Sequence, residues 1–233
     1  MKRMILLILV FGTLLPACRF KSGSGNIISE TRSLPAFTGI AVSSGIEVEL
    51  KSGTSASVIV EADDNVIESI ETTVNNGQLT IRARSMNFNN VHMKVLISAA
   101  GITRLKASGG AEIQVKDKLV SDTKIDCQAS GGASIEGYLD APELSIDASG
   151  GADITLAGRT RDLVVEASGG ASINAEKILS EQTKANVSSG ASAHVHSSVS
   201  LDAHASSGGE LYYRGGGTLI KSESSGGTVE RDE

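Results

Sequence analysis

The 233-residue chain contains no tryptophan, and aromatic residues make up only 3% of it. This scarcity weighs against the aromatic platforms on which many glycan-binding proteins stack sugar rings. Cysteine is also scarce, with two residues in the whole chain, and basic residues are outnumbered by acidic ones, 21 to 27. The resulting formal charge of −6 argues against nucleic acid or anionic lipid headgroups as partners.

A single long apolar run is present, at the amino terminus. Within residues 1–15, the basic residues Lys2 and Arg3 are followed by an apolar stretch. This pattern is typical of a secretory signal, and the apolar stretch is too short for a membrane-spanning helix. The sequence Leu-Pro-Ala-Cys that ends at Cys18 resembles a bacterial lipobox, which implies cleavage before Cys18 and a diacylglycerol on its sulfur. We therefore expect a signal peptide over 1–17 and an outer-membrane lipoprotein that faces either the periplasm or the cell surface. The acyl chains on the cysteine would anchor it, because each methylene buried in the membrane contributes about 0.8 kcal/mol.

Processing at this site has two consequences. Loss of Lys2 and Arg3 changes the formal charge from −6 to −8, since two positive charges leave. With Cys18 lipidated, Cys127 is the only other cysteine, so no intrachain disulfide can form. Its place in an apolar column predicts a packing role for Cys127. Residues 18–29 then form the lipidated cysteine and a Ser/Gly tether.

The rest of the chain is dominated by one repeated motif, a serine followed by Gly or Ser and then an invariant glycine. Seven copies occur, and their first serines lie 18 to 22 residues apart. Such a period with a glycine in every unit predicts a solenoid of β-coils. The glycine suits a corner that needs positive φ or close approach of neighbouring turns, and the corner glycines are Gly110, Gly132, Gly151, Gly170, Gly190, Gly208 and Gly226.

Apolar and polar residues alternate on both sides of each corner. One coil, for example, has inward residues Leu144, Ile146, Ala148, Ala152, Ile154 and Leu156. Alternation on both sides predicts two half-buried strands that meet at a bend, and stacked coils would pair in parallel about 4.8 Å apart. We therefore predict an all-β fold, a single-stranded parallel β-helix of the pectin-lyase-like kind, with about seven coils over 102–233.

Residues 30–101 are less regular and predict an N-terminal β cap. Gly45 follows two serines and fits the corner template, so it predicts an opening coil. The Asn76-Gly77 pair between apolar strands predicts a hairpin. The acidic segment 63–68 reads as a short helix or turn. At the other end, Lys221 and Glu223 fit the pattern poorly and suggest a frayed last coil.

The order of these segments resembles one known family, "putative autotransporter adhesin, head GIN domain". The resemblance rests on residues 37–40, 48–50, 61–65, 77–81 and the recurring Ser-Gly-Gly corners, and it spans roughly residues 30–227. It implies lipoproteins or secreted proteins of Bacteroidetes-type bacteria, with a shape similar to pectin-lyase-type β-helices. It also implies a role in adhesion and no catalytic residues to transfer to this chain.

Few exposed residues suggest chemistry. His194 and His196 share one strand at period two, and His204 follows across the next corner, so a metal site would lack its third or fourth ligand. We expect solvated histidines, no metal and no cofactor. Tyr212 beside Arg214 could contact a sugar or a protein, although a role in capping the core is the simpler interpretation.

Two further features leave alternatives open. The Asn-rich loop over 86–90 could carry specificity, and it is equally a plain hairpin connection. The outward column two residues before each corner serine stacks like charges only where Asp147 meets Glu166, a pair that a cation could neutralise. Otherwise the outward acids are dispersed among serines and no long loop could build a cleft, which disfavours lyase chemistry.

Together these features predict a non-enzymatic, membrane-anchored lipoprotein of the cell envelope. It would act as an adhesin or an envelope scaffold that presents a polar solenoid face to a protein or glycan partner. A carbohydrate-binding module is the first alternative, and a degenerate polysaccharide-lyase-like enzyme is the second.

Overall fold

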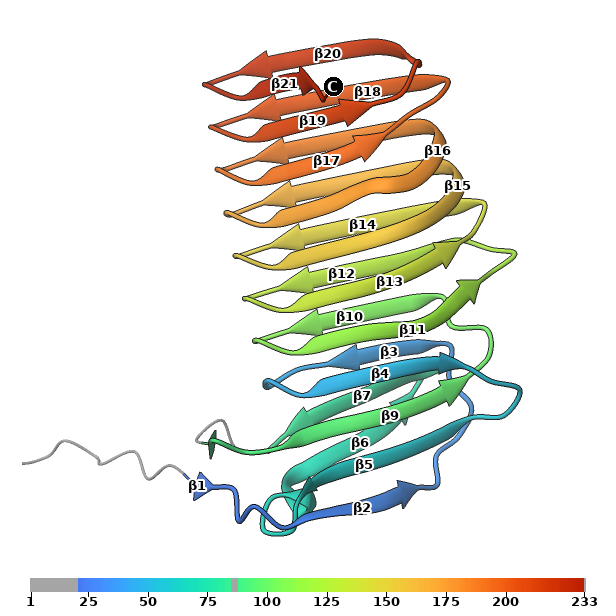
Figure 1. Ribbon diagram of the computed structural model, residues 1–233, viewed down its shortest axis with the longest axis vertical. Helices are drawn as coiled ribbons and strands as arrows, with labels where there is room; N and C mark the ends of the chain where they lie inside the picture. Colours follow the sequence, from blue (N-terminus) through green and yellow to red (C-terminus); the bar gives the residue numbers. More distant parts are fainter. Residues whose placement is uncertain (1–20, 85–87, 233) are drawn as a thin grey trace, which may run out of the picture.

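The computed structural model describes residues 21–84 and 88–232, and these form an upright stack of β-coils on a small β cap (Figure 1). Cys18 lies outside the described residues. Every coil has two faces, with a strand running to the Ser-Gly corner on one face and a strand leaving it on the other (Figure 1). The predicted all-β solenoid of about seven coils is confirmed.

The strands that lead to the corners form one parallel face. They are β3 (Gly39–Val42), β10 (Arg104–Ser108), β12 (Ile125–Ser130), β14 (Glu143–Ser149), the second halves of β15 (Asp153–Ser168) and β16 (Ser172–Ser188), β18 (Ser200–Ser206) and β20 (Thr218–Ser224). The strands that leave the corners form the opposite face. They are β4 (Glu47–Ser52), β11 (Glu112–Val120), β13 (Ser134–Asp140), the first halves of β15 and β16, β17 (Ser192–His196), β19 (Glu210–Arg214) and β21 (Thr228–Arg231).

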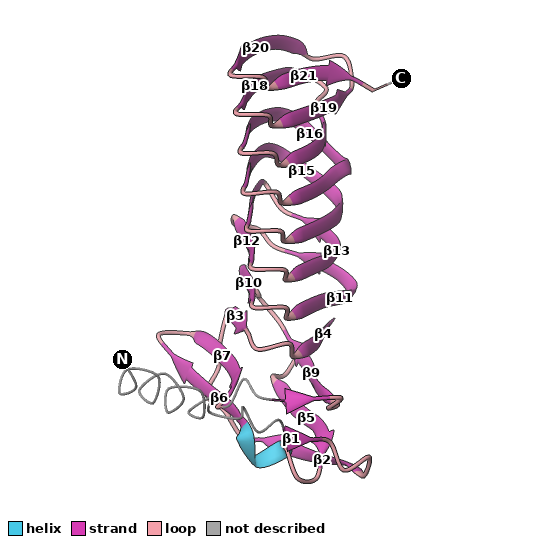
Figure 2. Ribbon diagram, turned by 90° about the vertical axis from the view of Figure 1, so that its left-hand side faces the viewer, coloured by secondary structure: helices cyan, strands magenta, loops and turns pink. Residues whose placement is uncertain are grey.

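The corners stack directly on one another because the coils pair in register. Ser108 lies opposite Ser130, and Ser130 lies opposite Ser149. Figure 2 looks onto this edge and shows the corner loops one above another. Each corner closes locally, as where the Ala111 amide donates to the Ser108 carbonyl at 3.2 Å, and it also bonds upward, as where the Gly110 amide donates to the Gly131 carbonyl at 3.1 Å.

Backbone conformation, rather than crowding, accounts for the invariant corner glycine. Gly45 and the seven repeat glycines have φ between +69° and +78°, and a Cβ added at any of them would meet no atom within 4 Å. The position before also has positive φ, yet Ser189, Ser207 and Ser225 occupy it with φ of +50° to +56°. Only the second of the two left-handed positions is therefore reserved for glycine in every copy.

The core is a thin apolar layer between the two faces. Leu105, Cys127, Ile146 and Val165 lie one above another in register, and each is at most 1% exposed. Burial raises the pKa of the Cys127 thiol to about 12, which keeps it in the unreactive protonated form. This column ends at Lys221, where strand β20 is almost wholly exposed. The last coil is nevertheless not frayed as predicted, because β20 pairs with β18 along its whole length.

The cap continues both faces beneath the first coil. β7 (Gln78–Ala83) pairs in parallel with β3, and β9 (Met93–Ala99) pairs in parallel with β4. Antiparallel partners complete the cap, and they are β2 (Ile27–Arg32), β5 (Ser57–Asp63) and β6 (Ile70–Asn75), with a 3₁₀ turn η1 (Ile67–Ser69) and the short pair β1 (Lys21–Ser22) and β8 (Phe88–Asn89). The predicted hairpin is the β6–β7 pair. Within the described ranges, no helix has the length and apolar character needed to cross a membrane.

Candidate functional site

Exposed side chains form straight columns along each face because the coils stack in register. On the face that leads to the corners, one column runs in the predicted order Lys106, Gln128, Asp147, Glu166, Asn186, His204 and Ser222. Asp147 does lie opposite Glu166. The exposed side chains thus form a regular array, and the register of the strands determines which of them are neighbours and can interact.

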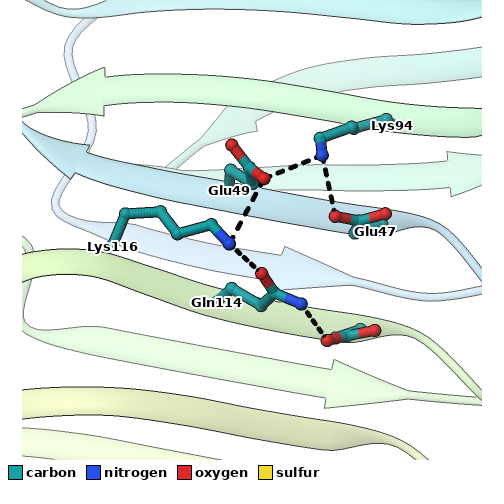
Figure 3. Close-up of polar contacts among 6 residues, drawn as sticks. Glu47, Glu49, Lys94, Gln114 and Lys116 are labelled. Carbon is teal, nitrogen blue, oxygen red and sulfur yellow. Dashed lines mark hydrogen bonds and ion pairs between the residues drawn. The ribbon is translucent and has the colours of Figure 1, made fainter.

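A second like-charge pair, not noticed in the sequence, lies where the first coil meets the repeat. Glu47 lies opposite Glu112, and each carboxylate has a different partner, because Glu47 pairs with Lys94 while Glu112 accepts a hydrogen bond from the Gln114 amide (Figure 3). The Lys94 ammonium lies 2.9 Å from Glu47 Oε1 and 2.7 Å from Glu49 Oε1, and Lys116 Nζ lies 3.3 Å from the same Glu49 oxygen. The network joins strand β9 of the cap to β4 and β11 of the stack.

These contacts shift the pKa values of their members in the stabilising direction. Hydrogen bonding to Glu49 and then Glu47 raises the pKa of Lys94, and hydrogen bonding from Lys94 lowers the pKa of Glu49. Both side chains are about four-fifths covered, at 21% and 18% exposure. The network therefore acts as a structural clamp between cap and solenoid, and its carboxylates Glu47 and Glu49 are already paired with lysines.

The edge opposite the corners holds a hollow of about 570 Å³ between neighbouring coils. Its lining includes Arg159, Arg161, Glu181 and His196. Arg159 is exposed, whereas the Arg161 guanidinium bonds the carboxylate of Asp162 at 2.8 Å. The hollow therefore presents cationic, anionic and imidazole groups side by side.

The core next to this hollow contains two buried hydroxyl side chains, those of Ser180, which lines the hollow, and Thr183. Thr183 lies opposite Leu163 and Leu201, so it replaces an apolar residue in an inward column. Its hydroxyl lies 2.7 Å from that of Ser180, and both hydroxyls donate to the carbonyl of His196. Thr183 in a leucine column is the sequence signal that could have identified this region.

His196 faces this hollow and does not join His194. The His196 Nδ1 is buried and has no hydrogen-bond partner among the residues that the structure describes. His204 lies on the opposite face, with its Nε2 3.0 Å from Asp202 Oδ1. The three histidines that the sequence placed near one another are therefore in three different environments.

His194 lies in a cluster near the carboxyl-terminal end. Its ring stacks on that of Tyr212, directly opposite it on the next coil, with centroids 4.7 Å apart and planes 15° apart. His194 Nδ1 lies 3.1 Å from Asp232 Oδ2. Negative charge gathers here, and the nearby carboxylate of Glu210 raises the pKa of the Tyr212 hydroxyl.

The remaining carboxylate of this cluster comes from a β-bulge. Thr155 of β15 pairs with Asn174, but Ala157 pairs with Lys177, so β16 contains one extra residue at this point. Glu176 belongs to that extra turn of chain, and one of its carboxylate oxygens lies within 4.8 Å of ligand atoms of both His194 and Asp232. The structure thus brings to His194 two carboxylates that the sequence did not associate with it.

Tyr213, the neighbour of Tyr212, is partly buried and packs against the core. The Asn-rich loop lies partly outside the described residues, which resume at Phe88.

The described residues define the class of parallel β-solenoids, here with two faces, paired charges on those faces and a hollow at one edge. Within this class, the family model described as "Putative auto-transporter adhesin, head GIN domain" matches residues 36–217. The chain belongs to this family. No curated protein matches the sequence.

Solved structures agree on the fold. A putative adhesin from Bacteroides fragilis is 18% identical with a TM-score of 0.81, and the match covers 91% of this chain and 98% of that one. A putative adhesin from Parabacteroides merdae is also 18% identical, with a TM-score of 0.75 over 92% and 99% of the two chains. A putative lipid binding protein from Parabacteroides distasonis is 17% identical, with a TM-score of 0.74 over 92% and 100%.

Proposed function

We propose that this protein is a non-enzymatic, adhesin-like binding protein of the cell envelope, anchored to the outer membrane through a lipid on Cys18. The family supports the adhesin-like role, and the Leu-Pro-Ala-Cys sequence supports the anchor. The observation that carries the proposal is the edge hollow of about 570 Å³, because it is the size of a site for a small ligand or a side-chain cluster of a partner.

The hollow suits recognition better than turnover. The carboxylate of Asp140, in its lining, is held by Lys118 Nζ at 2.6 Å, and Arg161 is held by Asp162. Charges balanced by fixed neighbours orient a polar ligand without needing to exchange protons. Arg159 remains exposed as a group that could bind a carboxylate or sulfate of the partner.

Carbohydrate is the second candidate ligand. Arginine, carboxylate, hydroxyl and imidazole groups together line the hollow, and such groups match the hydroxyl and acidic substituents of envelope polysaccharides. Binding here would rely on hydrogen bonds, in keeping with the scarcity of aromatic residues.

The test compares binding of the protein to bacterial and host cells and to a glycan array. The double variant Arg159→Ala/Arg161→Ala should weaken binding by roughly tenfold to a hundredfold, since loss of one charged hydrogen bond to the partner, that of exposed Arg159, costs about 1.5–3 kcal/mol. The control Arg82→Ala/Arg84→Ala removes two arginines from the cap hairpin, where both bond Glu71. Equal binding by the two double variants would contradict the site.

The same polysaccharides should show no turnover. Release of reducing sugar or of unsaturated uronide by the wild-type protein would contradict the non-enzymatic role and favour lyase-like chemistry. Protease treatment of intact cells would show which membrane face carries the protein, because only a surface-exposed chain is cleaved.

A further inference from the structure

Three side chains from distant parts of the sequence converge near the carboxyl-terminal end of the stack. Glu176 comes from the bulge in β16, His194 from the centre of β17, and Asp232 from just beyond β21. One ligand atom from each lies within 4.8 Å of the other two. Residues 38 positions apart, His194 and Asp232, are already in contact at 3.1 Å.

Each of the three groups is held in place by its surroundings. Tyr212 stacks on the His194 ring and restricts its orientation. The Asp232 amide donates to the Tyr213 carbonyl at 3.0 Å, which fixes the backbone beside the carboxylate. The Glu176 amide donates to the side chain of Asn174 at 3.3 Å within the bulge. Supported ligands of this kind distinguish a built site from isolated surface histidines.

The donor set indicates the class of ligand. We propose that Glu176, His194 and Asp232 bind a divalent transition-metal ion, with Zn²⁺ as the best match. One imidazole nitrogen and two carboxylate oxygens are zinc ligands, whereas calcium and magnesium favour sites built from oxygen alone. Three protein ligands leave a fourth position for water or for a group of a binding partner.

The geometry needs only side-chain adjustment. Zinc ligands lie about 2.1 Å from the metal, so tetrahedral ligand atoms are about 3.4 Å apart. The three side chains are 26% to 37% exposed, which leaves them room to close from 4.8 Å. Arg214 bonds one oxygen of Glu176 at 2.7 Å, and the second oxygen of that carboxylate is a further donor for the ion.

Metal binding would also stabilise the end of the solenoid. Asp232 follows β21, while Glu176 and His194 belong to the coils below it. An ion bound by all three would link the last strand to two earlier coils. Because β20 is largely exposed and contributes little to the core, such a link would reduce opening of the terminal coil.

Isothermal titration of the full chain in detergent with ZnCl₂ alone tests the site. We expect one equivalent to bind with a dissociation constant below about 100 µM, and CaCl₂ to bind far more weakly. His194→Ala, Glu176→Gln and Asp232→Asn should each weaken zinc binding at least tenfold. The matched control is His204→Ala, which removes an imidazole that also pairs with a carboxylate, Asp202, but has no third ligand within residues 21–84 and 88–232.

Zinc binding no tighter than millimolar, or equal losses in His194→Ala and His204→Ala, would overturn the proposal. Retained affinity in Asp232→Asn, or calcium binding as tight as zinc, would do so as well. Hydrogen exchange gives a second readout that does not depend on a variant folding. Zinc should slow exchange of the β21 amides in the wild-type chain, and unchanged exchange at saturating zinc would contradict the role of Asp232.

Discussion

Replacement of one corner glycine tests the physical basis of the whole stack. Gly132 has φ of +74°, and a Cβ at this position would meet no atom within 4 Å. Gly132→Ala therefore introduces no clash, and its cost is the left-handed backbone alone, about 1–2 kcal/mol for a residue with a Cβ. The alanine also restricts the unfolded chain, which offsets about 0.4–1 kcal/mol of that cost.

Gly216 provides a matched control for this substitution. It also has open space around its Cβ position, but its φ lies outside the left-handed range. Gly216→Ala should leave the stability unchanged or raise it by about 0.4–1 kcal/mol. The two variants make the same chemical change in equally open surroundings, so the difference between them isolates the backbone strain at the corner.

Urea unfolding followed by circular dichroism measures both variants. Relative to Gly216→Ala, Gly132→Ala should be less stable by about 1–2 kcal/mol, which for a chain of this length lowers the melting temperature by roughly 2–8 °C. Equal unfolding midpoints would refute the argument that positive φ, and not packing, reserves this position for glycine.

Three further predictions concern the anchor, the clamp and the core. Cys18→Ser should move the protein from the membrane fraction to the soluble fraction and abolish labelling by an alkyne fatty acid, and unchanged fractionation would contradict lipid anchoring. Lys94→Ala should cost about 1 kcal/mol in urea unfolding because two ion pairs are lost. The pairing lowers the pKa of Glu49 below its ordinary value of 4.5, so it stabilises the fold at pH values above 4.5 and this stabilisation is lost as the pH falls through the folded-state pKa. The Lys94→Ala variant should therefore lose less stability on acidification than the wild type, and an unaltered pH profile would contradict the clamp. Ile146→Ala should cost about 2–5 kcal/mol, whereas Ile220→Ala, at a side chain 67% exposed, should change stability by less than about 0.5 kcal/mol; similar effects of the two would contradict the assignment of the core.

The periodic part of this molecule could be predicted from the sequence because the same local determinants of structure recur in every repeat. A corner glycine and alternating apolar residues in every coil determine which side chains point inward, and in-register stacking then determines the exposed columns. The column from Lys106 to Ser222 followed from counting alone. The opening coil could be identified in the same way, because Gly45 fits the corner template. In the structure the Gly45 amide donates a hydrogen bond to the Gly109 carbonyl of the next corner at 3.1 Å.

The candidate sites depend on departures from the repeat, and these were harder to read. Glu176 owes its position to one extra residue in β16, visible in the sequence only as a spacing of 20 residues between Ser168 and Ser188. Asp232 reaches His194 through the path of the last strand, which no local pattern specifies. Thr183 in a leucine column was a signal that could have been used, because a hydroxyl at an inward position requires partners.

Because the coils stack in register, the length of the molecule increases by a fixed step with each coil. Each coil adds about 4.8 Å, so a chain tethered near its cap holds its last coils some 30 Å farther from the tether than its first. Duplication of one unit of about 19 residues would lengthen that reach by a single step and leave both ends chemically intact, since every coil offers its neighbours the same backbone pattern. With the lipid anchor proposed at Cys18, the distance from the membrane would be a quantity that selection can adjust separately from the groups displayed on the last coils.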